Sequence, residues 1–166
     1  MRTAGVGVRA GGRVGLAAWL SWGLLLAASG CRTASDLAPV RLDDPGWSVR
    51  HGQAVWVRAL GADGVAGELL VATGPEGACW VEFSKPPFGL ATARSEREGW
   101  SLVEPGARLR KRGSGAAPAG AIWFALAGAT RGTAPGGGWR FETGADGGWR
   151  LWQPETGESL EGYWAP

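Results

Sequence analysis

Few side chains in this sequence could carry covalent or metal chemistry. The only histidine is His51, and the only cysteines are Cys31 and Cys79. One histidine and two distant cysteines do not make the ligand set of a zinc site, and no nucleophile motif accompanies His51 to complete a catalytic triad. The glycine-rich stretch 113–120 lacks the lysine of a phosphate-binding loop. The sequence therefore predicts a protein that is not an enzyme and that needs no cofactor or metal.

The position of Cys31 is the most informative of the three. Arg2, Arg9 and Arg13 form a basic head, and Leu16–Ala28 is a 13-residue, mainly apolar run that ends just before this cysteine. The run has the length of a signal-peptide core. It is shorter than the roughly 20 apolar residues that span a bilayer. We therefore predict a signal peptide over residues 1–30.

The residues Ala28, Ser29, Gly30 and Cys31 resemble the bacterial lipobox. The resemblance implies that Cys31 is acylated and becomes the first residue of the mature protein. Buried acyl chains contribute about 0.8 kcal/mol per CH₂, so several chains would give a lasting membrane anchor. Arg32 stands where an aspartate would favour inner-membrane retention, so the resemblance implies the outer membrane, facing the periplasm. The alternative is an ordinary secretory signal, because small residues also suit general cleavage.

The mature chain would be one domain with nearly balanced charge. Three of the 17 basic residues and none of the 15 acidic ones precede Cys31, which leaves 14 basic and 15 acidic residues. This balance argues against nucleic-acid binding. We interpret residues 31–46 as the lipidated cysteine followed by a tether with a reach of about 20 Å. Residues 47–166 predict one compact domain, and we expect a monomer.

The second cysteine, Cys79, lies in the apolar run "ACWVEFS". If Cys31 is acylated, Cys79 has no partner for a disulfide within the chain. We interpret it as a small core residue, with a reactive thiol as the alternative. With an ordinary secretory signal, a disulfide between Cys31 and Cys79 would become conceivable.

From Trp47 onward, the dominant pattern is alternation by twos between glycine-containing turns, which predicts a mainly β domain. Strands are predicted in "GQAVWVRA", "GELLVAT" and "ACWVEFS", and again at 139–142, 149–153 and 160–164. The segment "GADGG" between the two runs at 139–153 predicts a hairpin turn. The alanine-rich segment 116–130, with Pro118 near its start, predicts one short helix that covers a face of the sheet.

Tryptophans and arginines stand out in this domain. All but Trp19 and Trp22 of the chain's 11 tryptophans follow Cys31. Large rings can fill the core of a small sheet, or they can line a slot for apolar ligand chains. In "ARLRKRG", Arg108, Arg110 and Arg112 alternate with other residues. This run predicts a charged sheet edge, with contact to phosphate-bearing lipid headgroups as the alternative.

The segment 79–106 is similar to the centre of the LolA/LolB-like lipoprotein-localisation family, in which an apolar strand leads into a proline-glycine loop and then into paired strands. That loop is "PPFGL" here, while "AIWFALAG" and "PETGESLEGYW" resemble the family's short helix and closing strands. The resemblance implies a curved, unclosed antiparallel half-barrel with a short helical lid, and a cavity that accepts the acyl chains of lipids or lipoproteins. It also implies that a loop with an apolar tip, here Phe88 and Leu90, helps to pass on the cargo.

We therefore expect an outer-membrane lipoprotein that holds acyl chains in a concave apolar surface and exchanges them with the membrane or a periplasmic carrier protein. The alternation by twos selects the candidate lining residues. These are Val55, Val57, Leu69, Val71, Val81, Phe83, Trp100, Trp139, Phe141 and Trp149. Two other functions stay open, namely a structural or interaction lipoprotein with a filled core, and an envelope enzyme that would have to use His51.

Overall fold

The computed structural model describes residues 40–104 and 110–166, which form one β-rich unit with a single α-helix in this part of the chain. The predicted signal peptide, Cys31, residues 31–39 of the predicted tether, and Arg108 lie outside the described residues. The elements are β1 (Ser48–Val57), β2 (Val65–Thr73), the 3-10 turn η1 (Pro75–Gly77), β3 (Cys79–Lys85), β4 (Phe88–Glu96), β5 (Gly99–Val103), β6 (Lys111–Ser114), α2 (Ile122–Thr130), β7 (Arg140–Thr143), β8 (Gly148–Trp152) and β9 (Ser159–Trp164).

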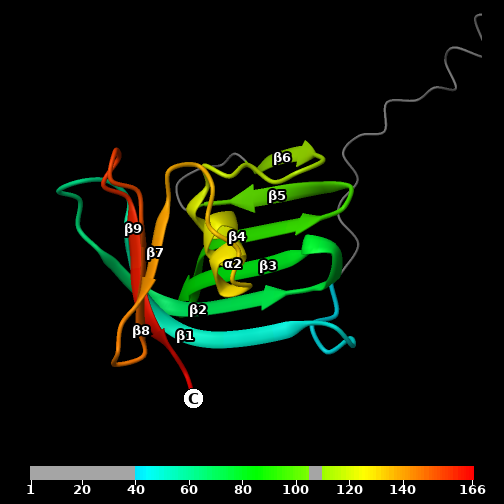
Figure 1. Ribbon diagram of the computed structural model, residues 1–166, viewed down its shortest axis with the longest axis horizontal. Coiled ribbons are helices and arrows are strands. Elements are labelled where there is room, and N and C mark those ends of the chain that lie inside the picture. The colour runs from blue at the N-terminus through cyan, green and yellow to red at the C-terminus, as the bar shows by residue number, and fades with distance from the viewer. Residues whose placement is uncertain (1–39, 105–109) are drawn as a thin grey trace, which may run out of the picture. The chain divides into compact units, whose positions relative to one another are not determined.

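The strands form one unclosed, nine-stranded antiparallel sheet in the order β6-β5-β4-β3-β2-β1-β9-β8-β7. Strands β1 to β6 follow each other as a meander, and the three C-terminal strands join it through the pairing of β1 with β9. The sheet bends strongly at this junction, so that β7, β8 and β9 run across the direction of the other strands (Figure 1). The sheet is therefore a curved half-barrel with β6 and β7 as its two free edges.

Close backbone contact makes the junction between β1 and β9 possible. Gly162 pairs with Ala54, and a Cβ at Gly162 would lie 2.0 Å from the carbonyl oxygen of Gln53. A Cβ at Gly52 would lie 2.4 Å from the carbonyl oxygen of Tyr163. Only glycine fits at these two positions, because any larger side chain would push the paired strands apart.

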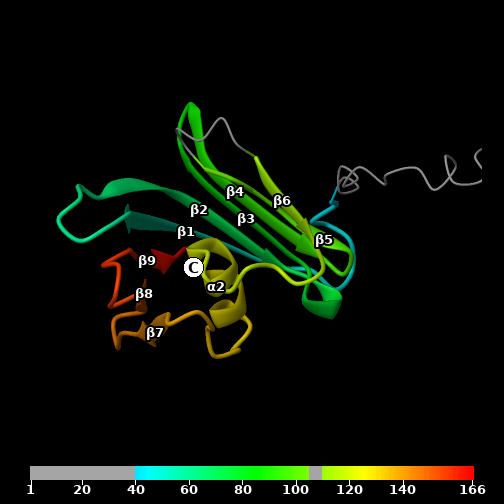
Figure 2. The ribbon, with the colours of Figure 1, turned by 90° about the horizontal axis from the view of Figure 1, so that it is seen from above.

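The helix α2 lies inside the curve of the sheet, between the β2–β5 region and the C-terminal strands (Figure 2). All but two of its residues are buried, and its sequence "IWFALAGAT" is apolar all round. A helix without a polar face is stable in water only when it is enclosed. Burial against β2, β3, β4 and β8 therefore accounts for a short helix that has no side-chain cap at its N-terminus.

The predicted mainly β class, the strand runs, the "GADGG" turn and the helix are confirmed. The helix begins at Ile122 rather than near Pro118, because residues 118–121 form a separate turn in which the Ala121 N–H donates to the Pro118 carbonyl at 3.1 Å. It covers the concave face of the sheet, as predicted, and is buried there as part of the core. The predicted charged edge agrees with the position of β6, whose residues Lys111 and Arg112 are exposed.

The predicted inward face of β1 is wrong. Val55 and Val57 are half-buried and lie outside the core, whereas Ala54 and Trp56 are each 3% exposed inside it. Both sets alternate by twos and both are apolar, so the period alone could not decide between them. The indole of Trp56 gains more by burial than a valine does, and it packs edge-on against Phe83 with the ring centroids 6.3 Å apart.

Candidate functional site

The concave face of the sheet, where the sequence predicts a lipid cavity, is occupied by α2. Trp123 and Leu126 of this helix are 0% exposed. The Trp123 ring stacks on Phe83 at a centroid distance of 5.5 Å and meets Trp56 at 4.9 Å. The helix therefore fills the space that a large central cavity would need.

Most of the predicted lining residues do come together, but as core residues. Trp100 and Phe141 are half-buried and pack against this core, while Val55 and Val57 take the other face of β1. The buried members, all in one cluster with α2, are Leu69, Val71, Val81, Phe83, Trp139 and Trp149. Of the predicted set, only Trp100 lines the cleft described next.

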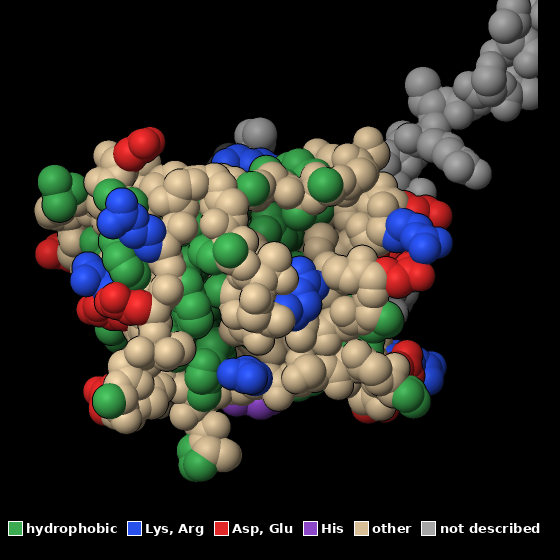
Figure 3. Space-filling model, viewed as in Figure 1, with side chains coloured by type: hydrophobic (Ala, Val, Ile, Leu, Met, Phe, Trp, Pro, Cys, Tyr) green, Lys and Arg blue, Asp and Glu red, His purple; other side chains and the backbone are tan. Residues whose placement is uncertain are grey.

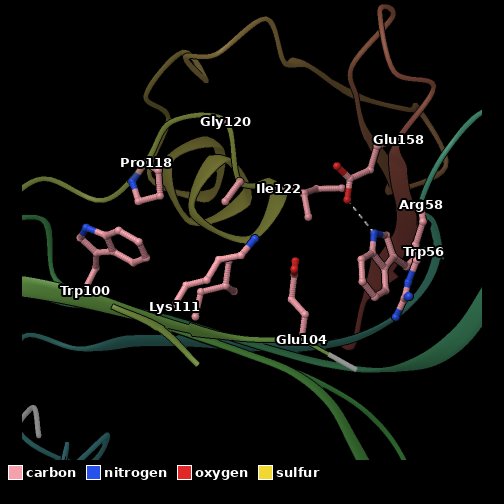
Figure 4. Close-up of a pocket in the computed structure, with 11 residues that line it drawn as sticks. Trp56, Arg58, Trp100, Glu104, Lys111, Pro118, Gly120, Ile122 and Glu158 are labelled. Atoms are coloured by element: carbon pink, nitrogen blue, oxygen red, sulfur yellow. Dashed lines mark hydrogen bonds between the residues drawn. The ribbon is translucent and has the colours of Figure 1, made fainter. Parts of the chain in front are cut away.

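A cleft of about 540 Å³, lined by both apolar and charged side chains, lies where the chain enters α2 (Figure 4). Its volume falls within the usual range of small-molecule sites, about 300–1,000 Å³. Figure 4 shows Trp100 and Trp56 at its two ends, with Glu104 and Lys111 between them. The lining residues are Trp56, Arg58, Trp100, Leu102, Glu104, Lys111, Pro118, Gly120, Ala121, Ile122 and Glu158.

The alternation of β5 and β6 accounts for one wall of the cleft. Every second residue of a strand lies on the same face. On β5 these residues are Trp100 and Leu102, and Glu104, just after the strand, continues the same face. Lys111 pairs with Leu102 across to β6, and Gly113 pairs with Trp100. A Cβ at Gly113 would lie 2.6 Å from the Trp100 indole nitrogen, so the glycine leaves room for this ring beside the cleft.

Two glutamates are held in the cleft by buried indoles. Trp56 Nε1 donates to Glu158 Oε1 at 3.0 Å, and Trp123 Nε1 donates to Glu104 Oε1 at 3.0 Å. The first bond joins β1 to the residue before β9, and the second joins the first turn of α2 to the end of β5. A buried indole N–H usually has a hydrogen-bond partner, and here the two glutamates fill that role. The carboxylates are therefore fixed in place by the core itself.

The charges in the cleft interact. Burial raises the pKa of the Glu158 carboxyl above its ordinary value, the Trp56 hydrogen bond opposes this, and the nearby negative charge of Glu104 adds to the rise. Arg58, which lies over the Trp56 ring at 4.6 Å from its centroid, lowers the same pKa. Lys111 adds a second cation to the lining. The cleft thus combines apolar walls with two negative and two positive groups.

The predicted transfer loop divides into an exposed and a packed residue. Phe88 is 69% exposed directly after the Pro86–Pro87 turn, whereas Leu90 is half-buried against the core. Leu60, in the turn after β1, is 89% exposed and was not predicted. The turns carrying Leu60 and Phe88 lie at the same end of the antiparallel sheet as the cleft residues Glu104 and Glu158, because β1, β3 and β5 run parallel and all end there.

The remaining predicted residues have no role in this cleft. Cys79 is buried as expected, with its sulfur 3.2 Å from the Ser95 hydroxyl, and burial raises the pKa of its thiol, so it is a core residue. His51 is exposed and lies within β1. Within residues 40–104 and 110–166, no cluster of three His, Cys, Asp or Glu residues could hold a metal ion. In the same part of the chain no helix has the length and hydropathy of a membrane span.

Sequence reasoning missed most of the cleft. Glu104 could have been found by following the alternation of Trp100 and Leu102 two positions further. Glu158 meets Trp56 across 102 residues of sequence, and only the pairing of β1 with β9 brings the two together. No local pattern carries that information.

Comparison of the chain with protein-family models, with curated proteins and with solved structures found no match.

Proposed function

We propose that this protein is an outer-membrane lipoprotein, anchored through acylated Cys31, that binds the acyl chains of lipids or lipoproteins and passes them on without a covalent step. The LolA/LolB-like resemblance and the unclosed half-barrel support this proposal. The observation that carries it is the cleft at the start of α2, with Trp100, Leu102 and Ile122 as its apolar walls. This cleft replaces the filled concave face as the acyl-binding surface.

Transfer in this proposal follows a gradient of affinity. An acyl chain leaves a periplasmic carrier protein or a bilayer, is held in the cleft, and is released into the outer membrane. Binding would draw on apolar surface removed from water, about 25 cal/mol per Å². The exposed side chains Leu60 and Phe88 at the same end of the sheet are suited to touch a bilayer during this exchange.

Native mass spectrometry of the mature protein tests the proposal. The lipid-anchored protein is incubated with phospholipid vesicles, separated from them in detergent, and examined for bound lipid. We expect one bound phospholipid in the wild type and about tenfold less in Trp100→Ala, which removes one apolar wall. Trp152→Ala is the matched control, because Trp152 is also half-buried but lies outside the cleft. Equal retention by the two variants would contradict the proposal.

The second candidate is a structural or interaction lipoprotein without lipid cargo. The complete burial of Trp123 and Leu126, which leaves the concave face filled, favours it. Absence of bound lipid from the wild-type protein, after incubation with vesicles, would select this function over the first.

A further inference from the structure

We propose that the cleft selects phospholipids whose headgroup carries a primary ammonium beside its phosphate; this inference rests on the acyl-binding function proposed above. In this arrangement Glu104 and Glu158 receive the ammonium, Lys111 lies toward the phosphate, and the apolar walls hold the start of an acyl chain.

The two glutamates keep acceptor capacity for a ligand. Each receives an indole N–H on its Oε1 atom, from Trp123 and Trp56 respectively. An ionised carboxylate has about four lone-pair sites, the indole uses one of them, and Arg58 also lies close enough to Glu158 to lower the pKa of this carboxyl. Because the indoles belong to the core, the carboxylates already have fixed positions, and a bound ammonium would not have to order them.

The lining carries charges of both signs, which suits a zwitterionic headgroup. Glu104 raises the pKa of Glu158 and Arg58 lowers it, so charges of both signs act on this carboxylate. An ammonium beside the carboxylates forms charge-assisted hydrogen bonds, which are stronger than neutral ones. A primary ammonium has three N–H donors, and a trimethylammonium has none. The site should therefore discriminate between these two headgroups.

Lys111 supplies the matching charge for the phosphate. It pairs with Leu102, lines the cleft and is exposed. Figure 4 shows its side chain extending from the sheet toward the turn that precedes α2. A lysine binds phosphate as a point charge. The sequence left contact with lipid headgroups open for the basic run at 108–112. Within this run, we assign the contact to Lys111.

Headgroup selectivity is measured on the mature, lipid-anchored protein. It is incubated with vesicles of dioleoyl-phosphatidylethanolamine mixed with equal parts of dioleoyl-phosphatidylcholine and dioleoyl-phosphatidylglycerol, and bound lipid is identified by native mass spectrometry. We expect phosphatidylethanolamine to be enriched about tenfold over each of the other two lipids. Glu104→Gln and Glu158→Gln should abolish the enrichment while phosphatidylglycerol is still retained.

These two variants should preserve the fold, because a glutamine side-chain oxygen can still accept the indole N–H. Glu155→Gln is the matched control, since Glu155 is exposed in the same loop as Glu158 and does not line the cleft. Lys111→Gln should lower retention of phosphatidylethanolamine and phosphatidylglycerol alike. Unchanged enrichment in both cleft glutamate variants would overturn the inference.

The outcomes separate this inference from the function on which it rests. Equal retention of all three lipids would overturn headgroup selection and leave acyl binding in place. Absence of any bound lipid would contradict the acyl-binding function itself. Glycerophosphoethanolamine, the headgroup without acyl chains, distinguishes a lipid from a soluble ligand, and we expect no retained adduct with it. An adduct with this compound but none with the lipid would overturn the assignment to a lipid.

Discussion

The rings of Trp56 and Trp123 lie 4.9 Å apart at an interplanar angle of 66°, and each donates its N–H to a different glutamate of the cleft. Trp56 belongs to β1 and Trp123 to α2, so this contact joins the helix to the sheet. The hydrogen bonds to Glu158 and Glu104 then extend from the same pair toward the cleft. The same aromatic pair therefore takes part in core packing and holds the two glutamates of the cleft.

Removal of the Trp123 N–H should weaken the fold. Trp123→Phe keeps an aromatic ring against Phe83 but removes the donor to Glu104 and part of the buried ring. We expect the free energy of unfolding in urea to fall by about 2–4 kcal/mol. Trp152→Phe, at a half-buried position outside the core, should lower it by less than about 1 kcal/mol. Equal losses of unfolding free energy in the two variants would show that Trp123 contributes no more to stability than the half-buried Trp152.

Ionisation of Glu158 should make the protein less stable as the pH rises. The pKa of this carboxyl is raised in the folded state, chiefly by burial. Its favourable contribution is therefore complete below the pKa of the unfolded chain, about 4.3, and is lost as the pH rises through the folded pKa. Glu158→Gln cannot ionise, so its stability relative to wild type should increase from pH 4 upward and then level off.

Urea unfolding at a series of pH values measures this difference. Glu155→Gln, in the same loop, controls for the loss of one negative charge. If the difference in unfolding free energy between wild type and Glu158→Gln stayed constant across the pH series, the pKa of Glu158 would be the same in the folded and unfolded states. That result would contradict the prediction.

Space beside Trp100 should be needed for lipid retention. In Gly113→Ala the new Cβ would stand 2.6 Å from the Trp100 indole nitrogen, so the ring has to move relative to the cleft. We expect severalfold lower lipid retention in the vesicle experiment. Gly89→Ala is the matched control, because a Cβ there meets no atom within 4 Å. If Gly113→Ala retained as much lipid as Gly89→Ala, Trp100 would not form a wall of the site.

A side chain at Gly162 should break the junction that curves the sheet. The Cβ of Gly162→Ala would stand 2.0 Å from the Gln53 carbonyl oxygen, inside the pairing of β9 with β1. We expect a loss of at least about 2 kcal/mol in the free energy of unfolding. Gly128→Ala, in α2 with open space around its Cβ, should instead stabilise the protein by about 0.5–1 kcal/mol. Thermal unfolding of the two variants gives the comparison, and shifts in the same direction would contradict it.

Much of the fold could be predicted from alternation and turn residues. The runs around Val81 and around Leu151 alternate with polar residues, so their buried faces were assigned correctly. In β1 both faces are apolar, and the packing of Trp56 against α2 decided which one is buried. Periodicity alone could not supply that contact, because α2 follows β1 by more than 60 residues.

The cleft was harder to predict than the core. Its charged residues Arg58, Glu104, Lys111 and Glu158 come from four separate segments that meet at one end of the sheet. Each of them resembles an ordinary surface residue in its own segment. Their grouping follows from strand order and from the position of α2, both of which are tertiary properties.

The central claim is that acyl chains bind in the cleft at the start of α2. Photo-crosslinking tests it most directly, with a phospholipid that carries a diazirine on its acyl chain bound to the mature protein and the labelled residues located by tandem mass spectrometry. We expect labels at Trp100, Leu102 and Ile122, and we expect excess unlabelled lipid to suppress them. Labels confined to the exposed turn residues Leu60 and Phe88, or no labels above a control that is not irradiated, would contradict the account.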